Sequence, residues 1–183
     1  MVTTDYLADP AELSTWLGVA ETDAKLLAAL SAASRRFRGA VRHPVSLVVA
    51  DTIVLDGSGA LSLLLPAAPV TEVSSVLADG QALSAGTDYT WSADGYLHRL
   101  GAVWPTGLRS VTVIYSHGYA EIPGDIQEVV IDQARALYAV LPGVQQQTVG
   151  AQSVTFGVQA ATGVTAQWSA AVDRYQLNRG ERP

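Results

Sequence analysis

The feature that most constrains this chain is a change of hydrophobic period along its length. Residues 10–41 and 123–141 place apolar side chains three and four positions apart, which is the period of amphipathic helices. Residues 45–119 lack this period and are rich in β-branched residues, with turn sequences roughly every 10 residues. The sequence therefore predicts an α+β fold in which an antiparallel β block is inserted into a small helical bundle.

The two helices of the first segment have recognisable ends. Asp9 can cap the first helix, and Glu12, three residues later, can complete a capping box. Gly18 is expected to end this helix, and either Thr22 or Asp23 to cap the second. We therefore expect an N-terminal helix pair that packs on the helix predicted over residues 123–141.

Turn residues and alternation mark the strands of the β block. The sequences Asp56-Gly57-Ser58-Gly59 and Asp79-Gly80 predict turns between strands. In the last strand Val111, Val113 and Tyr115 stand at alternate positions, which places them on one face. The block is expected to form an antiparallel sheet, a sandwich or a small barrel.

A third part follows the predicted bundle. Its polar residues 145–148 are expected to be mobile, residues 149–158 to form a strand or hairpin arm, and Thr165 to cap a last helix. The tail from residue 178 is polar and expected to fray. The predicted domains are the bundle (1–44 and 120–143), the inserted β block (45–119) and a C-terminal extension (144–183).

Composition excludes several classes of protein. The formal net charge of −6 argues against a protein that grips nucleic acid through its phosphates, although DNA can slide past such a surface. The chain has no cysteine, and therefore no disulfide or thiolate metal site. No secretory signal or membrane span is expected. Hydrophobic residues make up 49% and charged residues only 15%, so we expect surface to be buried between copies of the chain.

The three histidines are the first places to look for catalysis. His43 is expected to be a surface or capping residue, and His98 is expected to face solvent. His117 follows a serine, but adjacent strand residues point to opposite faces, so Ser116 and His117 cannot pair as nucleophile and base. A hydrolase that uses His117 with Asp94 or Asp125 is therefore the weakest hypothesis.

Other charged groups have structural interpretations. Asp125, Glu128 and Asp132 are expected to form the solvated face of one helix, with Asp132 paired to Arg135. The basic cluster over residues 35–38 complements the dipole at a helix end. No metal or cofactor motif is present, so the sequence predicts no catalytic, cofactor or metal residues.

Aromatic residues of the β block leave a second class of function open. An exposed row of Tyr89, Trp91, Tyr96 and Trp104 would suit a carbohydrate-binding or receptor-binding module. Their spacing favours burial in a core or between subunits instead.

A series of short motifs has a familiar order along residues 7–141. The motifs are Leu13-x-x-Trp16-Leu17-Gly18, Ala33-Ser34-Arg35-Arg36-Phe37-Arg38, Leu64-Leu65-Pro66, Pro69-Val70-x-x-Val73-x-x-Val76, Asp79-Gly80, Val113-x-Tyr115-x-His117-Gly118-Tyr119 and Ile122-Pro123-x-Asp125-Ile126. In this order the sequence resembles the head-to-tail adaptor (connector) proteins of long-tailed bacteriophages. The β insertion is larger than in the all-helical members of that family.

The resemblance implies a structural virion protein without enzymatic activity. Such adaptors form a ring of about a dozen subunits beneath the portal, line the channel through which DNA passes without specific binding, and connect capsid to tail. The implied partners are further copies of the chain, the portal protein and a downstream neck or tail-completion protein. The implied location is the neck of the virion, after folding and assembly in the host cytoplasm.

The C-terminal extension is expected to reach a neighbouring subunit or the portal. The residues predicted to make this contact are Trp168, Tyr175, Asn178, Arg179 and Arg182. A different neck role, such as a tail-completion protein, is the main alternative.

Overall fold

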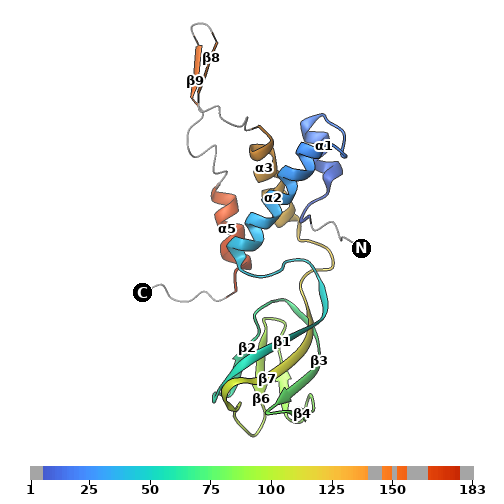
Figure 1. Ribbon diagram of the computed structural model, residues 1–183, viewed down its shortest axis with the longest axis vertical. Coiled ribbons are helices and arrows are strands. Elements are labelled where there is room, and N and C mark those ends of the chain that lie inside the picture. The colour runs from blue at the N-terminus through green and yellow to red at the C-terminus, as the bar shows by residue number, and fades with distance from the viewer. Residues whose placement is uncertain (1–5, 140–145, 150–151, 156–164, 178–183) are drawn as a thin grey trace. The chain divides into compact units, whose positions relative to one another are not determined.

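The computed structural model describes residues 6–139, 146–149, 152–155 and 165–177, and it has the predicted α+β fold (Figure 1). Within these residues an N-terminal helix pair packs on a central helix, and antiparallel sheets are inserted between them. The helices are α1 (Pro10–Leu17), α2 (Ala24–Val41), α3 (Gly124–Ala139) and α5 (Ala166–Tyr175). The chain divides into a helical unit, Met1–Arg42 with Ile122–Pro183, and a β unit, His43–Glu121.

Capping residues fix the starts of the first two helices. The carboxylate of Asp9 accepts the amide of Ala11 at 2.9 Å, and that of Asp23 accepts the amide of Leu26 at 2.8 Å. Both were predicted as caps. The capping-box bond expected from Glu12 does not form, because its side chain has no hydrogen-bond partner among the described residues. The carboxylate of Glu12 is left exposed.

Helix α2 is the centre of the helical unit, because it contacts α1, α3 and α5, which surround it in Figure 1. Phe37 of α2 meets Trp168 of α5 edge to face, with ring centroids 5.3 Å apart and an interplanar angle of 87°. Burial of the apolar stripe on each helix stabilises the unit. The core consists of Leu13, Leu26, Leu30, Ala33, Phe37, Val41, Ile126, Val130, Ala134 and Trp168.

The β unit contains two antiparallel sheets around one core. Their strands are β1 (Val48–Ser58), β2 (Ser62–Leu64), β3 (Val70–Ala78), β4 (Gln81–Leu83), β5 (Tyr89–Trp91), β6 (Tyr96–Arg99) and β7 (Thr106–His117). One sheet has the order β1-β7-β3-β4 and the other β2-β6-β5. Val111, Val113 and Tyr115 of β7 are each 0% exposed, which confirms the predicted alternation. Trp104 and Leu97 pack in the same core.

One predicted turn is confirmed and one is wrong. Asp79 and Gly80, with φ of 49° and 79°, form the two-residue turn that joins β3 to β4. The turn expected over residues 56–59 is instead part of an irregular strand, because β1 continues to Ser58 with a register shift just before Gly57. A side chain at Gly57 would collide with the carbonyl of Pro105, so this glycine permits a close approach between chain segments.

Backbone hydrogen bonds join the entry and the exit of the β unit. The amide of Leu47 donates to the carbonyl of Tyr119, and the amide of Tyr119 donates to the carbonyl of Val45, both at 2.9 Å. Gly118, which precedes Tyr119, has a φ of 91°, and a Cβ on this residue would collide with the carbonyl of Ser46. We call these contacts the entry–exit clasp.

The C-terminal extension contains a hairpin and a helix. Strands β8 (Gln146–Val149) and β9 (Gln152–Thr155) pair in antiparallel fashion, so the strand structure begins earlier than predicted, within the glutamine run. The hydroxyl of Thr165 accepts the amide of Trp168 at 3.1 Å, which confirms the predicted cap of α5. Residues 156–158 and the tail from residue 178 lie outside the described residues.

Substitution of Gly118 tests the entry–exit clasp. Gly118→Ala should lower the free energy of unfolding by about 3 kcal/mol, because the added Cβ collides with the backbone and the left-handed φ disfavours a side chain. The measurement is urea denaturation followed by tryptophan fluorescence.

The matched control is Gly80→Ala. Gly80 also has a positive φ of 79°, but nothing lies within 4 Å of a Cβ built there. The expected loss is about 1 kcal/mol, from the backbone conformation alone. Equal losses for the two variants would show that crowding at Ser46 does not constrain the clasp.

Candidate functional site

His117, the most reactive candidate in the sequence, lies at the buried end of β7. Its side chain is 1% exposed, and its Nε2 is 3.2 Å from Oδ2 of Asp51 on the neighbouring strand β1. The hydroxyl of Ser116 accepts a hydrogen bond from the amide of Ala50 at 3.2 Å. This hydroxyl therefore takes part in the hydrogen bonding of the sheet and is not positioned as a nucleophile. His117 pairs with Asp51 and not with Asp94, its Nδ1 is buried without a hydrogen-bond partner among the described residues, and the carboxylate of Asp125 bonds to Arg174 and Tyr175. The hydrolase hypothesis therefore has no geometric support.

The other two histidines have structural contacts. His43 is 5% exposed, so of its two predicted roles the surface position is wrong, and its Nδ1 lies 2.7 Å from the carbonyl oxygen of Pro44. His98 is only partly buried, and its Nδ1 lies 2.9 Å from the hydroxyl of Ser62 on the paired strand β2. Both imidazole rings therefore lie within hydrogen-bonding distance of a neighbouring group of the β unit.

The aromatic residues of the β unit do not form an exposed row. Tyr89 is 2% and Trp104 0% exposed, and Trp91 packs partly buried against the same core, whereas Tyr96 is 54% exposed. The indole N–H of Trp104 donates to the carbonyl of Leu97 at 3.3 Å, which satisfies its polar atom inside the core. A carbohydrate platform made of these four rings is therefore excluded.

Acidic residues do not converge on a metal site. Among the described residues, no group of three or more histidine, aspartate or glutamate side chains could hold a metal ion. Asp132 pairs with Arg135 at 3.2 Å, as predicted, and Glu128 is exposed. In the described part of the chain, no helix is long and apolar enough to cross a membrane.

Asp125 has a role that the sequence did not predict. It was expected on a solvated helix face, but its carboxylate accepts hydrogen bonds from Arg174 and from the hydroxyl of Tyr175, both at 2.8 Å. These contacts join the first turn of α3 to the last turn of α5, and we call them the α5 latch. Negative charge near a helix N-terminus is a general signal, but nothing in the sequence identified a partner 49 residues away.

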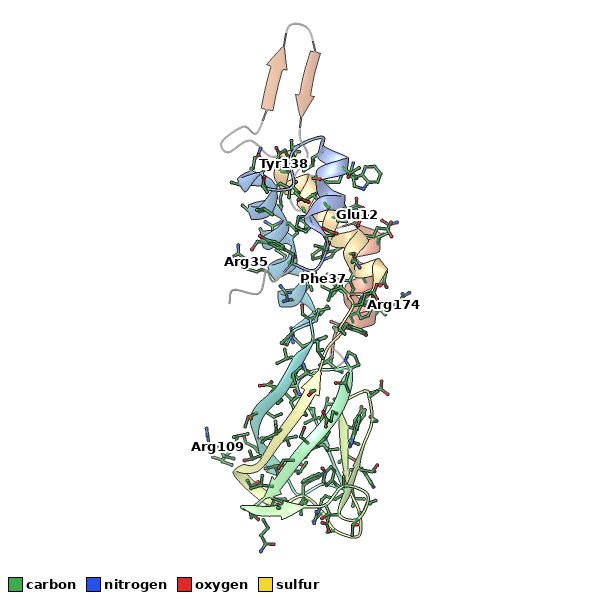
Figure 2. The ribbon with its side chains drawn as sticks, turned by 90° about the vertical axis from the view of Figure 1, so that its right-hand side faces the viewer. Glu12, Arg35, Phe37, Arg109, Tyr138 and Arg174 are labelled. Carbon is green, nitrogen blue, oxygen red and sulfur yellow. The ribbon has the colours of Figure 1, made fainter. Side chains whose placement is uncertain are left out.

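The predicted portal-contact residues fall into two groups. Trp168 is 8% exposed and packs on Phe37, and Tyr175 belongs to the α5 latch, so both hold α5 within the helical unit. Arg174, between them on α5, lies at the surface of that unit (Figure 2). Asn178, Arg179 and Arg182 lie outside the described residues. Contact with a portal or a neighbour stays a prediction for all five predicted residues.

Tyr115 is a buried phenol of β7 whose surroundings disfavour its ionised form. Its burial raises the pKa of the phenol to about 12, and the charge of Asp51 acts in the same direction. The backbone of Ala67 lies near the hydroxyl and lowers the pKa, although the geometry falls short of a hydrogen bond. Tyr115 is thus a neutral core residue at physiological pH.

The raised pKa of Tyr115 makes the stability of the β unit depend on pH. The pKa of Tyr115 is higher in the folded state, about 12, than in the unfolded state, about 10, because folding favours the neutral phenol. This contribution to stability is complete below about pH 10 and is lost as the pH rises through about 12. Urea denaturation at pH 9 to 12 should show a loss of about 2 kcal/mol. In Tyr115→Phe this loss should shrink, and an unchanged slope would contradict the assignment.

Substitutions in the α5 latch should loosen α5 selectively. Tyr175→Phe removes the hydrogen bond from the phenol to the carboxylate of Asp125. It should lower the free energy of opening of residues 166–175, measured by amide hydrogen exchange, by about 1 kcal/mol. Arg174→Ala removes an ion pair whose arginine is 69% exposed, and should have a smaller effect. The reverse order would show that the ion pair, not the phenol, holds the helix.

Comparison with known proteins shows what this fold is similar to. No known protein family matches the sequence, and neither does any curated protein. A chain in the neck of a native gene transfer agent (GTA) particle, computed with C12 symmetry, has 22% identity and a TM-score of 0.58, covering 100% of this chain and 96% of that one. A chain in the neck of an empty GTA particle, computed with C6 symmetry, has 24% identity and a TM-score of 0.60 over the same shares.

A third structure, the virion of a native GTA particle, contains a similar chain with 21% identity and a TM-score of 0.56. That match covers 93% of this chain and 90% of the other. At these identities the likeness shows a shared fold, and it extends over nearly the whole length of both partners.

Proposed function

We propose that this chain is a structural component of the neck of a phage-like particle, and specifically a head-to-tail adaptor. In this role it forms a ring beneath the portal, lines the DNA channel and connects capsid to tail. The observation that carries the proposal is the end-to-end likeness to chains of GTA necks, one of them in a C12-symmetric structure. A domain shared with unrelated proteins would be expected to match only part of such a chain.

Surface properties of the chain support an assembly role. Several large apolar side chains are exposed in the isolated chain, among them Leu108 at 84%, Val49 at 71% and Trp16 at 62%. Exposed apolar surface is stabilised when neighbouring subunits cover it. The net charge of −6 suits a channel that DNA passes without binding.

The contacts of the reactive residues support a role without catalysis. His117 is buried and paired with Asp51, and Ser116 is engaged by the backbone of β1. Neither is placed to receive a substrate, because catalysis requires a nucleophile and base that converge on an accessible position.

The proposed partner at the C-terminal end is the portal. Deletion of residues 145–183 would remove Trp168 from the helical core, so a loss of docking in that variant could reflect unfolding. Arg179→Glu with Arg182→Glu leaves α5 intact and reverses two charges of the predicted contact. This double variant separates docking from folding.

Negative-stain imaging of the purified chain, with and without the portal protein of its own particle, tests the proposal. The expected result is a closed ring of about a dozen copies that sits on the portal. The double variant should keep its helical circular dichroism and lose portal docking, because reversed charges repel a surface that bound the originals. Monomers under all conditions would contradict the adaptor role.

A further inference from the structure

The outward side of α2 carries a stripe of small residues around one arginine. Ala28, Arg35 and Gly39 are exposed and Ala32 is partly exposed, and their spacing places them on one face of the helix. We call these four residues the α2 outer face. Since three of the four side chains are a methyl group or a hydrogen, another chain can approach the α2 backbone closely here.

Arg35 gives the α2 outer face a positive charge. Its guanidinium has no hydrogen bond or ion pair among the described residues and extends away from the helices in Figure 2. Arg36 and Arg42 are also exposed at the same end of α2. An exposed carboxylate on a partner would therefore find a cation here.

The exposed side of α1 has complementary properties. Glu12 and Trp16 are four residues apart and so share one face of the helix. Trp16 is 62% exposed, with the guanidinium of Arg135 4.7 Å from its ring centre. Tryptophan is among the residues that contribute most to protein interfaces when it is buried. We call Glu12 and Trp16 the α1 outer face.

The two faces lie on different sides of the same unit. In Figure 2 Arg35 projects on the left of the helical unit, whereas Glu12 lies on its right. A closed ring needs two different surfaces on each subunit, because every copy meets one neighbour on each side. The two faces meet this requirement. The α1 outer face presents a carboxylate and an exposed indole, and the α2 outer face presents a cation and small side chains.

We infer that the α1 outer face of one copy packs on the α2 outer face of the next copy. Glu12 pairs with Arg35, and Trp16 lies over Ala32 and its small neighbours. This inference rests on the proposed ring function. It names the contact that joins the copies, gives Glu12 a partner that the described residues of one chain do not supply, and covers the exposed side of Trp16.

A second copy fits the α2 outer face better than DNA does. The net charge of the chain is −6, and Arg35 is the one cation among the four residues of this face, whose other members are alanine and glycine. Nucleic-acid surfaces instead present continuous basic stripes, commonly with aromatic platforms. The carboxylate of Glu12 supplies the complementary charge on the chain itself.

Charge reversal tests the contact. Glu12→Arg and Arg35→Glu each place like charges together, so each should abolish the ring seen by negative-stain imaging and mass photometry. The double variant Glu12→Arg with Arg35→Glu restores an opposite pair and should restore the ring. The matched control is Glu72→Arg, which makes the same change at an exposed position of β3 and should leave the ring intact.

Crosslinking gives an independent readout, because the chain has no cysteine. With a short bismaleimide, Glu12→Cys combined with Arg35→Cys should give a ladder of multimers on a denaturing gel. Either single cysteine variant should remain monomeric on the gel, since a head-to-tail contact needs a cysteine at both positions. A ring that gives no ladder in the double cysteine variant would overturn the contact.

Different results would overturn the ring function and the contact between Glu12 and Arg35. An unmodified chain that forms no closed ring would overturn the proposed function, and this contact with it. A ring that survives both Glu12→Arg and Arg35→Glu would overturn the contact alone and show that another surface joins the copies.

Discussion

The entry–exit clasp is the constraint on which the rest of the structure depends. Helices α2 and α3 share a core although the whole β unit separates them in sequence. Closing so long an insertion costs chain entropy unless its two ends are held together. Two backbone hydrogen bonds between residues 45–47 and Tyr119 do this, and Gly118 allows the chains to approach. The β unit thus returns the chain close to where it left.

Within the helical unit, α5 is attached by two kinds of contact. The Trp168–Phe37 ring pair buries apolar surface, while the α5 latch adds charge-assisted hydrogen bonds at the other end of the helix. The ring pair buries one end of α5 in the core, and the α5 latch ties its other end to the start of α3. The C-terminal end of α5 is consequently held in a defined position on the helical unit.

Local signals in the sequence predicted most of the fold. Caps such as Asp9, Asp23 and Thr165, and the Asp79-Gly80 turn, depend on residues a few positions apart, so their chemistry is visible in the sequence. The alternation in β7 predicted its buried face for the same reason. The irregular strand at Gly57 was not predictable, because this residue lies against the carbonyl of Pro105, far along the chain.

The candidate site was harder to predict than the fold. Strand alternation separated Ser116 from His117 correctly, but it could not reveal Asp51 as the partner of His117. The burial of His43 and the α5 latch also depend on tertiary contacts that carry no local pattern. Contacts of this kind join residues that are far apart in the sequence, so local patterns could not identify them.

The entry–exit clasp also has an evolutionary consequence. Because both ends of the β unit are joined by its own backbone, the unit behaves as a cassette whose surface loops can lengthen, shorten or change charge while its attachment stays the same. Selection for a new neighbour can act on the β unit without disturbing the apolar stripe of α2. A single helical scaffold can in this way be retained while the surface of the β unit changes.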